Sequence, residues 1–425
     1  MMRLTNGSRV VIVGGGPAGS FAALHLLKFA REAQLSLDVL ILEPRDFSRP
    51  GPGGCNKCAG ILSSSLPRDL QTLGLNLPDE IIQAELDTYI LHLDKTEFQI
   101  HRPDSERRIL SVYRGSGPRL GAPPFPHSFD GWLLDQARER GVVVQRARVR
   151  SIQPGPHPLV ITAQATLEAD LVIVATGVNS RPPLDPAWGY HPPRTEVMAQ
   201  DEIFIPAELC GHCVHVYFDY LPGLIFGALI PKGRYANISL LGRHLPPGAV
   251  DDFLDGNVFP ALFPDGLHKL CGCTPRVAVT AAGGYFADRM VVVGDAAVTR
   301  LYKNGIGMAF ITARAAAQTA IQRGVSRRDF ARSYAPICRG IVADNLYGRL
   351  LFSLWEITRR IPFLLRAWEK AVAAEINQPP QRQMHIRILW GMFSGDEPYR
   401  RLFWISLSRS ALMDIWKGLR ENQHG

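Results

Sequence analysis

The sequence predicts an α/β fold, in which a twisted parallel sheet covered by helices is joined to an antiparallel sheet and a helical C-terminal region. The chain opens with a β-branched run (Arg9–Val13), a glycine turn, an apolar helical stretch (Pro17–Ala30) and a second buried-strand pattern (Leu37–Leu42). This order is typical of a βαβ unit, whose two strands lie parallel. Two later runs, Leu171–Val174 and Met290–Val293, are apolar throughout and predict further strands buried on both faces.

At 425 residues, the chain is too long for one compact core, so several domains are expected. Their predicted boundaries follow changes in the pattern of apolar runs and turns along the sequence. Residues 1–185 are expected to form the first part of the domain with the parallel sheet, with a small excursion near 86–100. Residues 275–330 form its second part. Residues 186–274 contain short apolar runs punctuated by turns, which predict a β-rich domain for the substrate. Residues 331–425 are helical in pattern.

Composition and the N-terminus are typical of a globular cytoplasmic protein. Hydrophobic residues make up 46% of the chain and charged residues 20%, which excludes wholesale disorder. The 7 cysteines are an odd number in a long chain, unlike the dense, even set of a small secreted scaffold. The apolar run Val10–Val13 breaks at once into Gly14, so no signal peptide is expected. No stretch reaches the ~18 apolar residues of a membrane span, so any membrane contact is expected to be peripheral.

Positive charge is concentrated near the C-terminus. The net charge is +8, and residues 321–420 alone hold 17 Lys and Arg against 8 Asp and Glu. Such a bias suits lipid headgroups, an acidic electron donor or nucleic acid, and equally a solvated basic face. Nucleic acid is not expected, because no recognisable binding module is present. Trp and Arg interleave as in interfacial helices, which predicts either peripheral membrane contact or a helical cap with its Trp side chains inside. The side chains concerned are Trp355, Arg359, Arg360, Phe363, Trp368, Trp390, Arg400, Arg401, Trp404 and Trp416.

The glycine turn after the first strand has the spacing of a dinucleotide-binding site. Gly14-x-Gly16-x-x-Gly19 directly follows a strand and opens a helix. The first glycine permits the tight turn, the second lets the backbone approach a pyrophosphate, and the third packs helix on strand. Glu43, at the end of the second strand, is placed to accept hydrogen bonds from ribose hydroxyls. The cofactor contacts expected here are Gly14, Gly16, Pro17, Ala18, Gly19 and Glu43.

A second element, far downstream, favours FAD over NAD. Residues 291–297, Val-Val-Val-Gly-Asp-Ala-Ala, are followed by Gly305-Ile306-Gly307-Met308. This arrangement resembles the segment of FAD-dependent reductases and hydroxylases that holds ribitol and flavin. The resemblance implies that Asp295 bonds the ribitol chain and that the helix beginning near Gly307 directs amides at flavin O2. The contacts expected here are Gly294, Asp295, Gly305, Gly307 and Met308.

Two further stretches resemble parts of the same superfamily. Ala175-Thr176-Gly177 ends a strand of the kind that commonly lies near FAD. Thr176 stands where many flavin monooxygenases have Asp, which weakens a hydroxylase-type interaction with NAD(P)H. Arg114 resembles the flavin-contacting Arg ahead of a Phe-Asp-x-x-Leu helix. Val149 completes the expected cofactor contacts.

A loop at residues 54–60 reads Gly-Cys-Asn-Lys-Cys-Ala-Gly. With this loop and the FAD elements described above, the chain resembles the geranylgeranyl reductase family of FAD enzymes over residues 8–330. That family has the p-hydroxybenzoate hydroxylase-like fold with a Rossmann-like FAD domain, and carries a Cys-Ala-Gly or Cys-Gly-Glu loop beside the flavin. The resemblance implies hydride transfer from flavin N5 to a prenyl double bond, with Cys58 donating a proton or positioning the substrate. Alternatively, Cys55 and Cys58 form a redox dithiol. The residues expected beside the flavin are Cys55, Cys58, Ala59 and Gly60.

One strand departs from the family's pocket. Where the family has Tyr-x-Trp-x-Phe-Pro and flavin halogenases have Trp-x-Trp-x-Ile-Pro, residues 226–231 are Phe-Gly-Ala-Leu-Ile-Pro. Only Ile-Pro matches the halogenases, so halogenation is not expected. Ala228 in place of Trp enlarges the cavity and predicts a substrate bulkier than, or unlike, a linear prenyl tail. Tyr302 also stands where the family often has Pro. The expected substrate pocket consists of Phe226, Ala228, Ile230 and Pro231.

The remaining cysteine pairs have spacings that metal sites use. Cys210-x-x-Cys213 and Cys271-x-Cys273 could together hold zinc or an iron–sulfur cluster. Nothing in the local sequence requires it, so structural or incidental thiols without a metal are expected.

The leading functional hypothesis is an FAD-dependent oxidoreductase that reduces carbon–carbon double bonds of a lipophilic, isoprenoid-type substrate. Two alternatives stay open: a flavin monooxygenase of a hydrophobic or aromatic compound, and an electron-transfer flavoprotein that feeds quinone. The electron donor is NAD(P)H, ferredoxin or a quinol, which the sequence does not distinguish.

Overall fold

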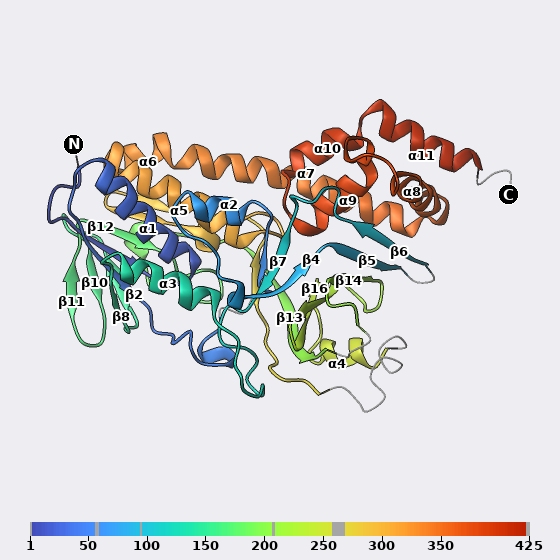
Figure 1. Cartoon of the computed structure of the whole chain (residues 1–425). Coiled ribbons are helices and arrows are strands. Elements are labelled where there is room, and N and C mark those ends of the chain that lie inside the picture. The colour runs from blue at the N-terminus through green and yellow to red at the C-terminus, as the bar shows by residue number, and fades with distance from the viewer. Residues whose placement is uncertain (1, 56–58, 94–95, 206–208, 257–267, 422–425) are drawn as a thin grey trace.

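The computed structural model describes residues 2–55, 59–93, 96–205, 209–256 and 268–421. Figure 1 shows a sheet with its covering helices at the left, a second, larger sheet at the lower right and the C-terminal helices along the upper right. The two sheets and the C-terminal helices meet around the centre of the molecule, where the candidate site lies.

A six-stranded sheet forms the core of the N-terminal part. Its strands, in spatial order, are Phe286–Ala287 (β18), Met290–Val292 (β19), Leu171–Val174 (β12), Arg9–Val13 (β1), Asp38–Leu42 (β2) and Val143–Gln145 (β8). All neighbours are parallel except the β18–β19 pair at one edge. The parallel sheet that the sequence predicted is therefore present.

The two faces of this sheet are covered by different elements because strand side chains alternate between them. Val10 and Ile12 of β1 belong to a core formed with Pro17–Glu32 (α1), Phe129–Glu139 (α3) and Gly305–Gln322 (α5). Within it, Phe21 and Phe310 meet edge to face, with ring centres 5.1 Å apart. Val11 and Val13 face the opposite core. This core includes residues of a small antiparallel sheet of Ser151–Gln153 (β9), Leu159–Ile161 (β10) and Thr166–Glu168 (β11).

A seven-stranded sheet forms the second part. Its strands, in spatial order, are Arg276–Ala278 (β17), Thr195–Phe204 (β13), Tyr235–Gly242 (β16), Leu224–Lys232 (β15), Cys213–Phe218 (β14), Thr88–Leu93 (β5) and Thr96–His101 (β6). The sheet is antiparallel as predicted, apart from the parallel pair β14–β5. The exception arises because β5 and β6 come from the excursion near residues 86–100, and no hairpin turn fixes their direction relative to β14.

A three-stranded antiparallel sheet lies next to β15 and links the two parts. It consists of Ile61–Leu62 (β3), Ile109–Val112 (β7) and Ile82–Leu86 (β4), and β4 and β7 both approach β15. Two short helices, Leu66–Gln71 (α2) and Ala249–Leu254 (α4), flank the first and second parts respectively. The chain therefore passes between the two parts several times.

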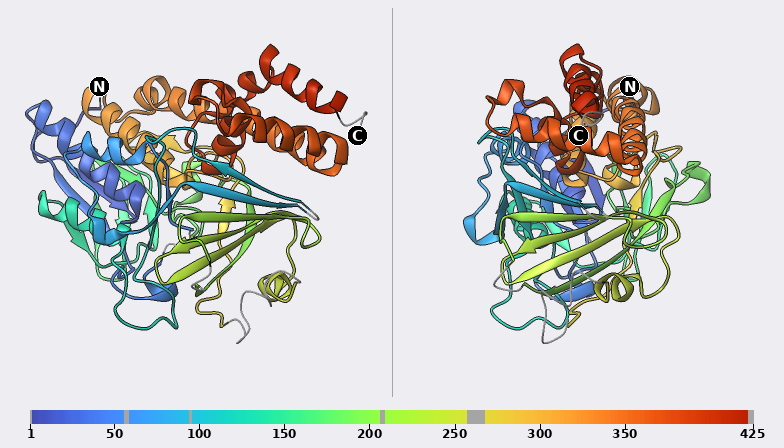
Figure 2. Two further views of the ribbon diagram at one scale, coloured as in Figure 1. Left: turned by 45° about the vertical axis from the view of Figure 1, so that its right-hand side comes forward. Right: turned by 90° about the vertical axis from the view of Figure 1, so that its right-hand side faces the viewer.

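In the C-terminal region the structure describes six α-helices. Figure 2 shows that several of them lie over the seven-stranded sheet. The six helices are Arg327–Ser333 (α6), Ala335–Arg360 (α7), Pro362–Glu375 (α8), Met384–Ser394 (α9), Tyr399–Ser406 (α10) and Arg409–Glu421 (α11). Trp355 of α7 meets Phe218 of β14 edge to face, and Trp390 of α9 does the same with Tyr89 of β5. Among the described helices, none is long and apolar enough to cross a membrane.

The Trp side chains of this region divide into two groups. Trp355 and Trp390 are 5% and 0% exposed and belong to the core that joins helices and sheet. Trp404 and Trp416 are 57% and 50% exposed. A helical cap with buried Trp side chains, one of the two predicted alternatives, therefore describes α7 and α9. In contrast, α10 and α11 expose aromatic side chains to solvent.

Candidate active site

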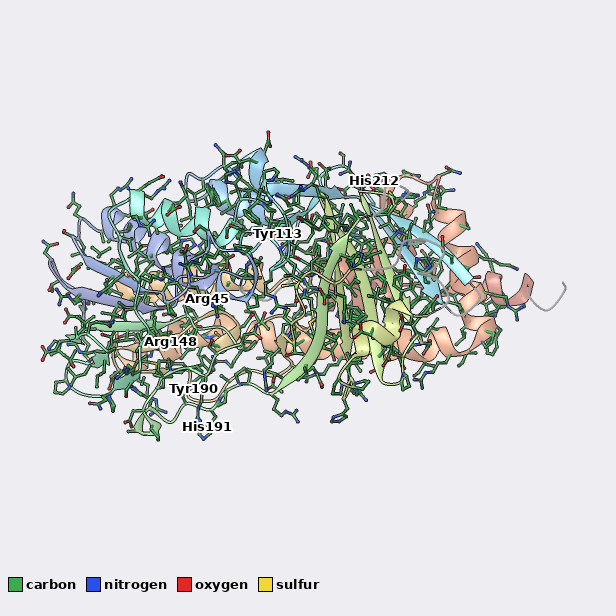
Figure 3. The ribbon with its side chains drawn as sticks, turned by 90° about the horizontal axis from the view of Figure 1, so that it is seen from below. Arg45, Tyr113, Arg148, Tyr190, His191 and His212 are labelled. Carbon is green, nitrogen blue, oxygen red and sulfur yellow. A yellow bond between two sulfur atoms is a disulfide. The ribbon has the colours of Figure 1, made fainter. Side chains whose placement is uncertain are left out.

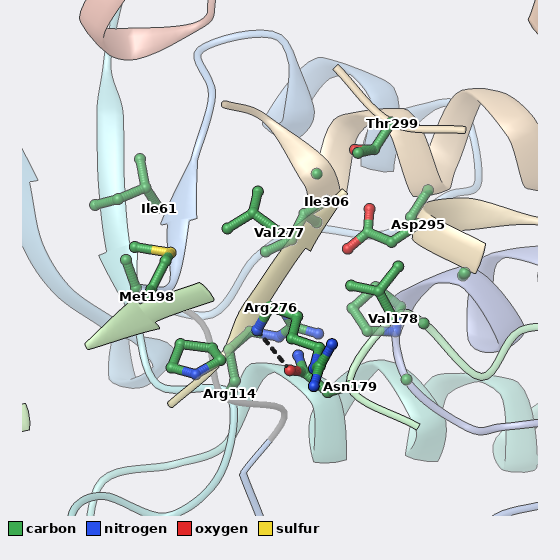
Figure 4. Close-up of a pocket in the computed structure, with 18 of the residues that line it drawn as sticks. Ile61, Arg114, Val178, Asn179, Met198, Arg276, Val277, Asp295, Thr299 and Ile306 are labelled. Carbon is green, nitrogen blue, oxygen red and sulfur yellow. Dashed lines mark hydrogen bonds between the residues drawn. The ribbon is translucent and has the colours of Figure 1, made fainter. Parts of the chain in front are cut away.

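A cavity of about 330 Å³ lies between the carboxyl ends of β1, β2 and β12, one face of the seven-stranded sheet, and α9. In α/β sheets, ligands bind outside the carboxyl ends of the strands, so the position agrees with the predicted cofactor site. In Figure 4, Asp295, Thr299 and Ile306 lie on one side of the cavity, and Ile61 and Met198 on the other. The predicted site residues that line the cavity are Gly14, Gly16, Pro17, Ala18, Glu43, Ala59, Arg114, Val149, Ala175, Thr176, Gly177, Phe226, Ala228, Ile230, Asp295 and Gly305.

The glycine turn approaches the neighbouring strand too closely for any side chain. Gly14 has φ of 108°, and a Cβ there would lie 2.6 Å from the carbonyl oxygen of Ala175. A Cβ on Gly19 would lie 1.8 Å from the carbonyl oxygen of Gly14, so the helix could not start at this distance. Gly19 itself does not line the cavity but sets the position of the turn. The fold therefore places bare backbone at the N-terminus of α1, where a pyrophosphate binds best.

Glu43 is buried at the end of β2 and ties that strand to the glycine turn. Its Oε2 accepts a hydrogen bond from the Gly15 amide at 2.7 Å, and its Oε1 accepts one from the Arg45 amide at 2.9 Å. Each carboxylate oxygen keeps a second lone pair, so the group can still accept from ribose hydroxyls. Arg45 and Arg148, both labelled in Figure 3, line the cavity and contribute positive charge to the site.

Several buried polar atoms of the cavity have no hydrogen-bond partner among the described residues. They include Thr176 Oγ1, Asp295 Oδ1 and Thr299 Oγ1. Burial raises the pKa of Asp295, while the Thr299 hydroxyl and Arg114 oppose the rise. Buried polar groups are normally satisfied, so these atoms are suited to bind a polyhydroxylated ligand such as ribitol.

The N-terminus of α5 offers free amides to the same space. The helix begins at Gly305, before the predicted start near Gly307. The amide of Gly307 donates to Asn304 Oδ1, and the amide of Met308 to the Asn304 carbonyl. Gly305 and Ile306, which line the cavity, have no amide acceptor among the described residues. Consequently these two amides, rather than those of Gly307 and Met308, are available to an electron-rich ligand atom.

Arg114 is fixed beside the cavity by a buried ion pair. Its Nε and Nη2 donate to the two carboxylate oxygens of Asp130, in the first turn of α3, at 2.5 and 2.9 Å. The side chains are 10% and 0% exposed. This bidentate contact holds the guanidinium plane in one orientation, so Arg114 presents a positioned donor surface to a ligand.

The predicted cysteine loop is only partly described. Cys58 lies outside the described residues, so the structure does not place it. Cys55 is half-buried, does not line the cavity and lies close enough to Tyr113 to influence the pKa of that phenol. Ala59 lines the cavity, whereas Gly60 lies behind it, against the Val112 carbonyl. The described part of the loop therefore borders the site at Ala59.

One face of the seven-stranded sheet forms the half of the cavity where the substrate is expected. Phe226, Ala228 and Ile230 alternate along β15 and line it, as predicted. Pro231 points elsewhere, because it is one residue out of that alternation. The sequence analysis missed the residues on neighbouring strands, although alternation on β14 and β16 was a usable signal. Those residues are Tyr89, Met198, Gln200, Val214, Val216, Ser239 and Leu241, together with Tyr302, Lys303 and Phe393 from other elements.

The remaining predicted residues and cysteines lie outside the cavity. Gly294 is buried where β19 meets α1, and a Cβ there would touch Ala18 at 2.7 Å. Cys210 and Cys213 form a disulfide. Cys273 Sγ contacts Gln200 Oε1 at 3.6 Å. Among the described residues, no group of potential metal ligands combines the two cysteine pairs.

No protein-family model and no curated protein sequence matches the chain. Solved structures match it along almost its whole length. A geranylgeranyl bacteriochlorophyll reductase-like protein from Thermoplasma acidophilum has a TM-score of 0.62 at 16% identity, over 98% of this chain and 97% of its own. A flavin-dependent brominase has a TM-score of 0.62 at 15% identity, over 98% and 100%. The p-nitrophenol 4-monooxygenase of Pseudomonas putida has a TM-score of 0.56 at 16% identity, over 98% and 99%.

The likeness extends over both sheets and the helical region, and it agrees with the elements that the sequence predicted. Two of the matching structures, the brominase and a flavin-dependent halogenase, are flavin-dependent enzymes. The chain therefore has the p-hydroxybenzoate hydroxylase-like fold of FAD-binding flavoenzymes.

Proposed function

We propose that the chain is an FAD-dependent oxidoreductase that reduces a carbon–carbon double bond of a largely apolar substrate. The observation that carries the proposal is the continuity of the cavity, which joins a dinucleotide cradle to an apolar pocket on the seven-stranded sheet. A bound FAD would thus have its redox-active ring at the entrance to a space that favours a hydrophobic molecule.

The cradle fits the successive parts of FAD. The turn at Gly14 and Gly16 would hold the pyrophosphate, Glu43 the adenosine ribose, and Asp295 the ribitol chain. The amides of Gly305 and Ile306 and the fixed guanidinium of Arg114 would bind the flavin. FAD, when bound, supplies a hydride at flavin N5 after reduction by an electron donor such as NAD(P)H, ferredoxin or a quinol.

The pocket residues exclude water and orient the substrate. Phe226, Ala228 and Ile230 are all at most 5% exposed, as are Val214 and Val216. Exclusion of water from the site favours hydride transfer, because water would otherwise react with reactive intermediates. Ala228, which leaves more space than a Trp, favours a bulky apolar molecule of isoprenoid type.

Anaerobic reduction of the purified protein followed by incubation with lipid extracts tests this proposal. The protein should be yellow, with FAD released by heat in an equimolar amount. Mass spectrometry should find products that have gained two hydrogen atoms per double bond, without oxygen consumption. Gain of an oxygen atom with oxygen uptake would indicate a monooxygenase. Turnover of a quinone analogue without a reduced olefin would indicate an electron-transfer flavoprotein.

The outer helices support a peripheral membrane contact as part of the same proposal. On α11, Leu412, Met413 and Trp416 are each 50–54% exposed. The Arg420 guanidinium lies 3.5 Å from the centre of the Trp416 ring, so cationic and aromatic groups share one surface. Such a surface suits an anionic bilayer, from which an apolar substrate would enter the enzyme.

A further inference from the structure

The side chain of Lys303 enters the cavity without a carboxylate partner. Lys303 is a lining residue, and its Nζ lies 4.1 Å from the centre of the Phe226 ring of β15. Among the residues that the structure describes, none forms a hydrogen bond or an ion pair with Nζ, and burial is the one cause that acts on its pKa. The amine therefore stands in the substrate half of the cavity, against a predicted pocket residue.

The backbone on both sides of Lys303 adopts an unfavourable conformation. Tyr302 has φ of 63° and Asn304 φ of 55°, in the left-handed region that costs a non-glycine residue about 1 kcal/mol or more. The neighbouring structure imposes it: Asn304 Nδ2 and Arg300 Nη1 both donate to the Gly395 carbonyl, at 3.3 and 2.8 Å. The Leu301 amide donates to Asn345 Oδ1 at 2.8 Å. Fixed contacts thus hold Lys303 toward the cavity at the expense of local strain.

The surroundings of Lys303 bring the pKa of its amine close to neutral pH. Burial lowers its pKa to about 7, so both the amine and the ammonium are populated near pH 7. An isolated double bond offers this amine no oxygen to bind. The ammonium lies over the Phe226 ring, but a desolvated cation without a hydrogen-bond acceptor is costly. A substrate oxygen at Nζ would remove that cost.

We propose that Lys303 binds a carbonyl oxygen of the substrate, so that the enzyme acts on apolar molecules whose double bond is conjugated to a carbonyl group. This inference rests on the proposed reductase function and names its substrate class. Such conjugation also suits hydride addition, because the negative charge that develops moves to the oxygen that the ammonium binds.

The reaction balances with the groups named. The carbon β to the carbonyl accepts the hydride that the reduced flavin supplies. The electron pair of the carbon–carbon double bond then forms a double bond between the α-carbon and the carbonyl carbon, and the π pair of the carbonyl group moves to the oxygen. Lys303 Nζ donates its proton to this oxygen, and the resulting enol tautomerises by moving the hydrogen to the α-carbon. The neutral amine regains a proton from water. The substrate gains two hydrogen atoms, and the external electron donor reduces the flavin again.

Binding of a matched pair of probes tests the inference without turnover. Chalcone and trans-stilbene both contain one double bond and two phenyl rings, and only in chalcone does a carbonyl group stand between the double bond and one of the rings. Calorimetric titration of the oxidised, FAD-loaded wild type should give a preference for chalcone of about tenfold or more, as expected for a hydrogen bond to a charged group. Lys303→Met should abolish this preference and leave the affinity for stilbene unchanged. Lys303→Arg, which retains a cation, should keep most of the preference but slow the reduction of chalcone to dihydrochalcone.

The possible failures are separable. If Lys303→Met folds and retains FAD, as judged by thermal unfolding and flavin absorbance, and still prefers chalcone, Lys303 does not bind the carbonyl and the inference is overturned. It is equally overturned if the wild type shows no preference. Loss of the preference in Lys303→Met, together with an absence of any reduced product from the wild-type protein, supports the Lys303 assignment and contradicts the reductase proposal.

Discussion

The carboxylate of Glu43 accepts a 2.7 Å hydrogen bond from the amide of Gly15, so the end of β2 and the glycine turn are held together by one side chain. Since the bond is buried, removal of the carboxylate leaves the Gly15 amide without its protein acceptor. The proposed nucleotide cradle consists of the glycine turn and the ribose-binding carboxylate of Glu43. Because this hydrogen bond joins them, a change at Glu43 also affects the position of the turn.

Glu43→Ala should weaken both folding and FAD retention. It leaves the Gly15 amide without its acceptor, which costs about 1–3 kcal/mol in the free energy of unfolding. Urea unfolding of the flavin-free protein measures that loss, and equilibrium dialysis measures FAD affinity. Glu43→Gln, which retains an acceptor oxygen, serves as the control and should recover most of the stability. Unchanged FAD affinity in the Ala variant would contradict the assigned role.

Asp295→Asn should stabilise the flavin-free protein while weakening FAD retention. Because burial raises the pKa of Asp295 in the folded state, its contribution to stability is full at low pH. That contribution is lost as pH rises through the folded-state value, and Asn avoids the loss. At pH 7 the flavin-free variant should therefore melt at a higher temperature than the wild type, and the difference should vanish below about pH 4. Weaker retention follows because ribitol hydroxyls donate better to a carboxylate than to an amide. Equal or tighter FAD binding by the variant would refute this role.

Cys58→Ser should lower turnover more than Cys55→Ser, with the flavin spectrum nearly unchanged in both. The expectation rests on the sequence resemblance for Cys58, which lies outside the described residues, and on the position of Cys55, which does not line the cavity. Steady-state rates of the two variants, compared at equal FAD content, decide the matter. Severe and equal losses would instead favour a redox dithiol.

Binding to anionic vesicles should depend on α11. Co-sedimentation with vesicles containing anionic lipid should fall as salt rises, because exposed charges are screened beyond ~8 Å at physiological ionic strength. Leu412→Ser combined with Trp416→Ser should reduce binding at low salt. Val143→Ser, an equally exposed apolar position on the edge strand β8, serves as the matched control and should have no effect. A wild-type protein that stays in solution at low salt would show that the outer helices do not bind membranes.

The sequence predicted those parts of the fold and site whose conformation depends on residues close by in the chain. The turn at Gly14 and the strand ends at Glu43 and Asp295 depend on local spacing, because strand, turn and helix follow each other directly. The resemblance of residues 226–231 to the family's pocket strand named Phe226, Ala228 and Ile230, which lie on one face of β15, and also Pro231, which does not line the cavity. These positions needed no knowledge of distant parts of the chain.

Other features depend on packing between distant segments and have no local signature. The parallel pairing of β5 with β14 joins residues more than a hundred positions apart. Phe393 enters the cavity lining only because α9 lies over the sheet. Lys303 precedes Asn304, whose side chain donates to the Gly395 carbonyl as does that of Arg300, so its direction depends on a distant segment and could not be inferred from its neighbours in sequence.

The strand order of the six-stranded sheet has a consequence for synthesis of the chain. β12, a central strand, pairs on one side with β1 and on the other with β19, which ends at Val292. While the ribosome is still making the segment between them, β12 has an unpaired edge. The nascent chain therefore holds an incomplete sheet while the 115 residues between Val174 and Met290 are made, and such edges favour association with other chains. Rapid overexpression should thus produce aggregates of incomplete chains, and chaperones that bind nascent apolar strands should raise the yield of folded protein.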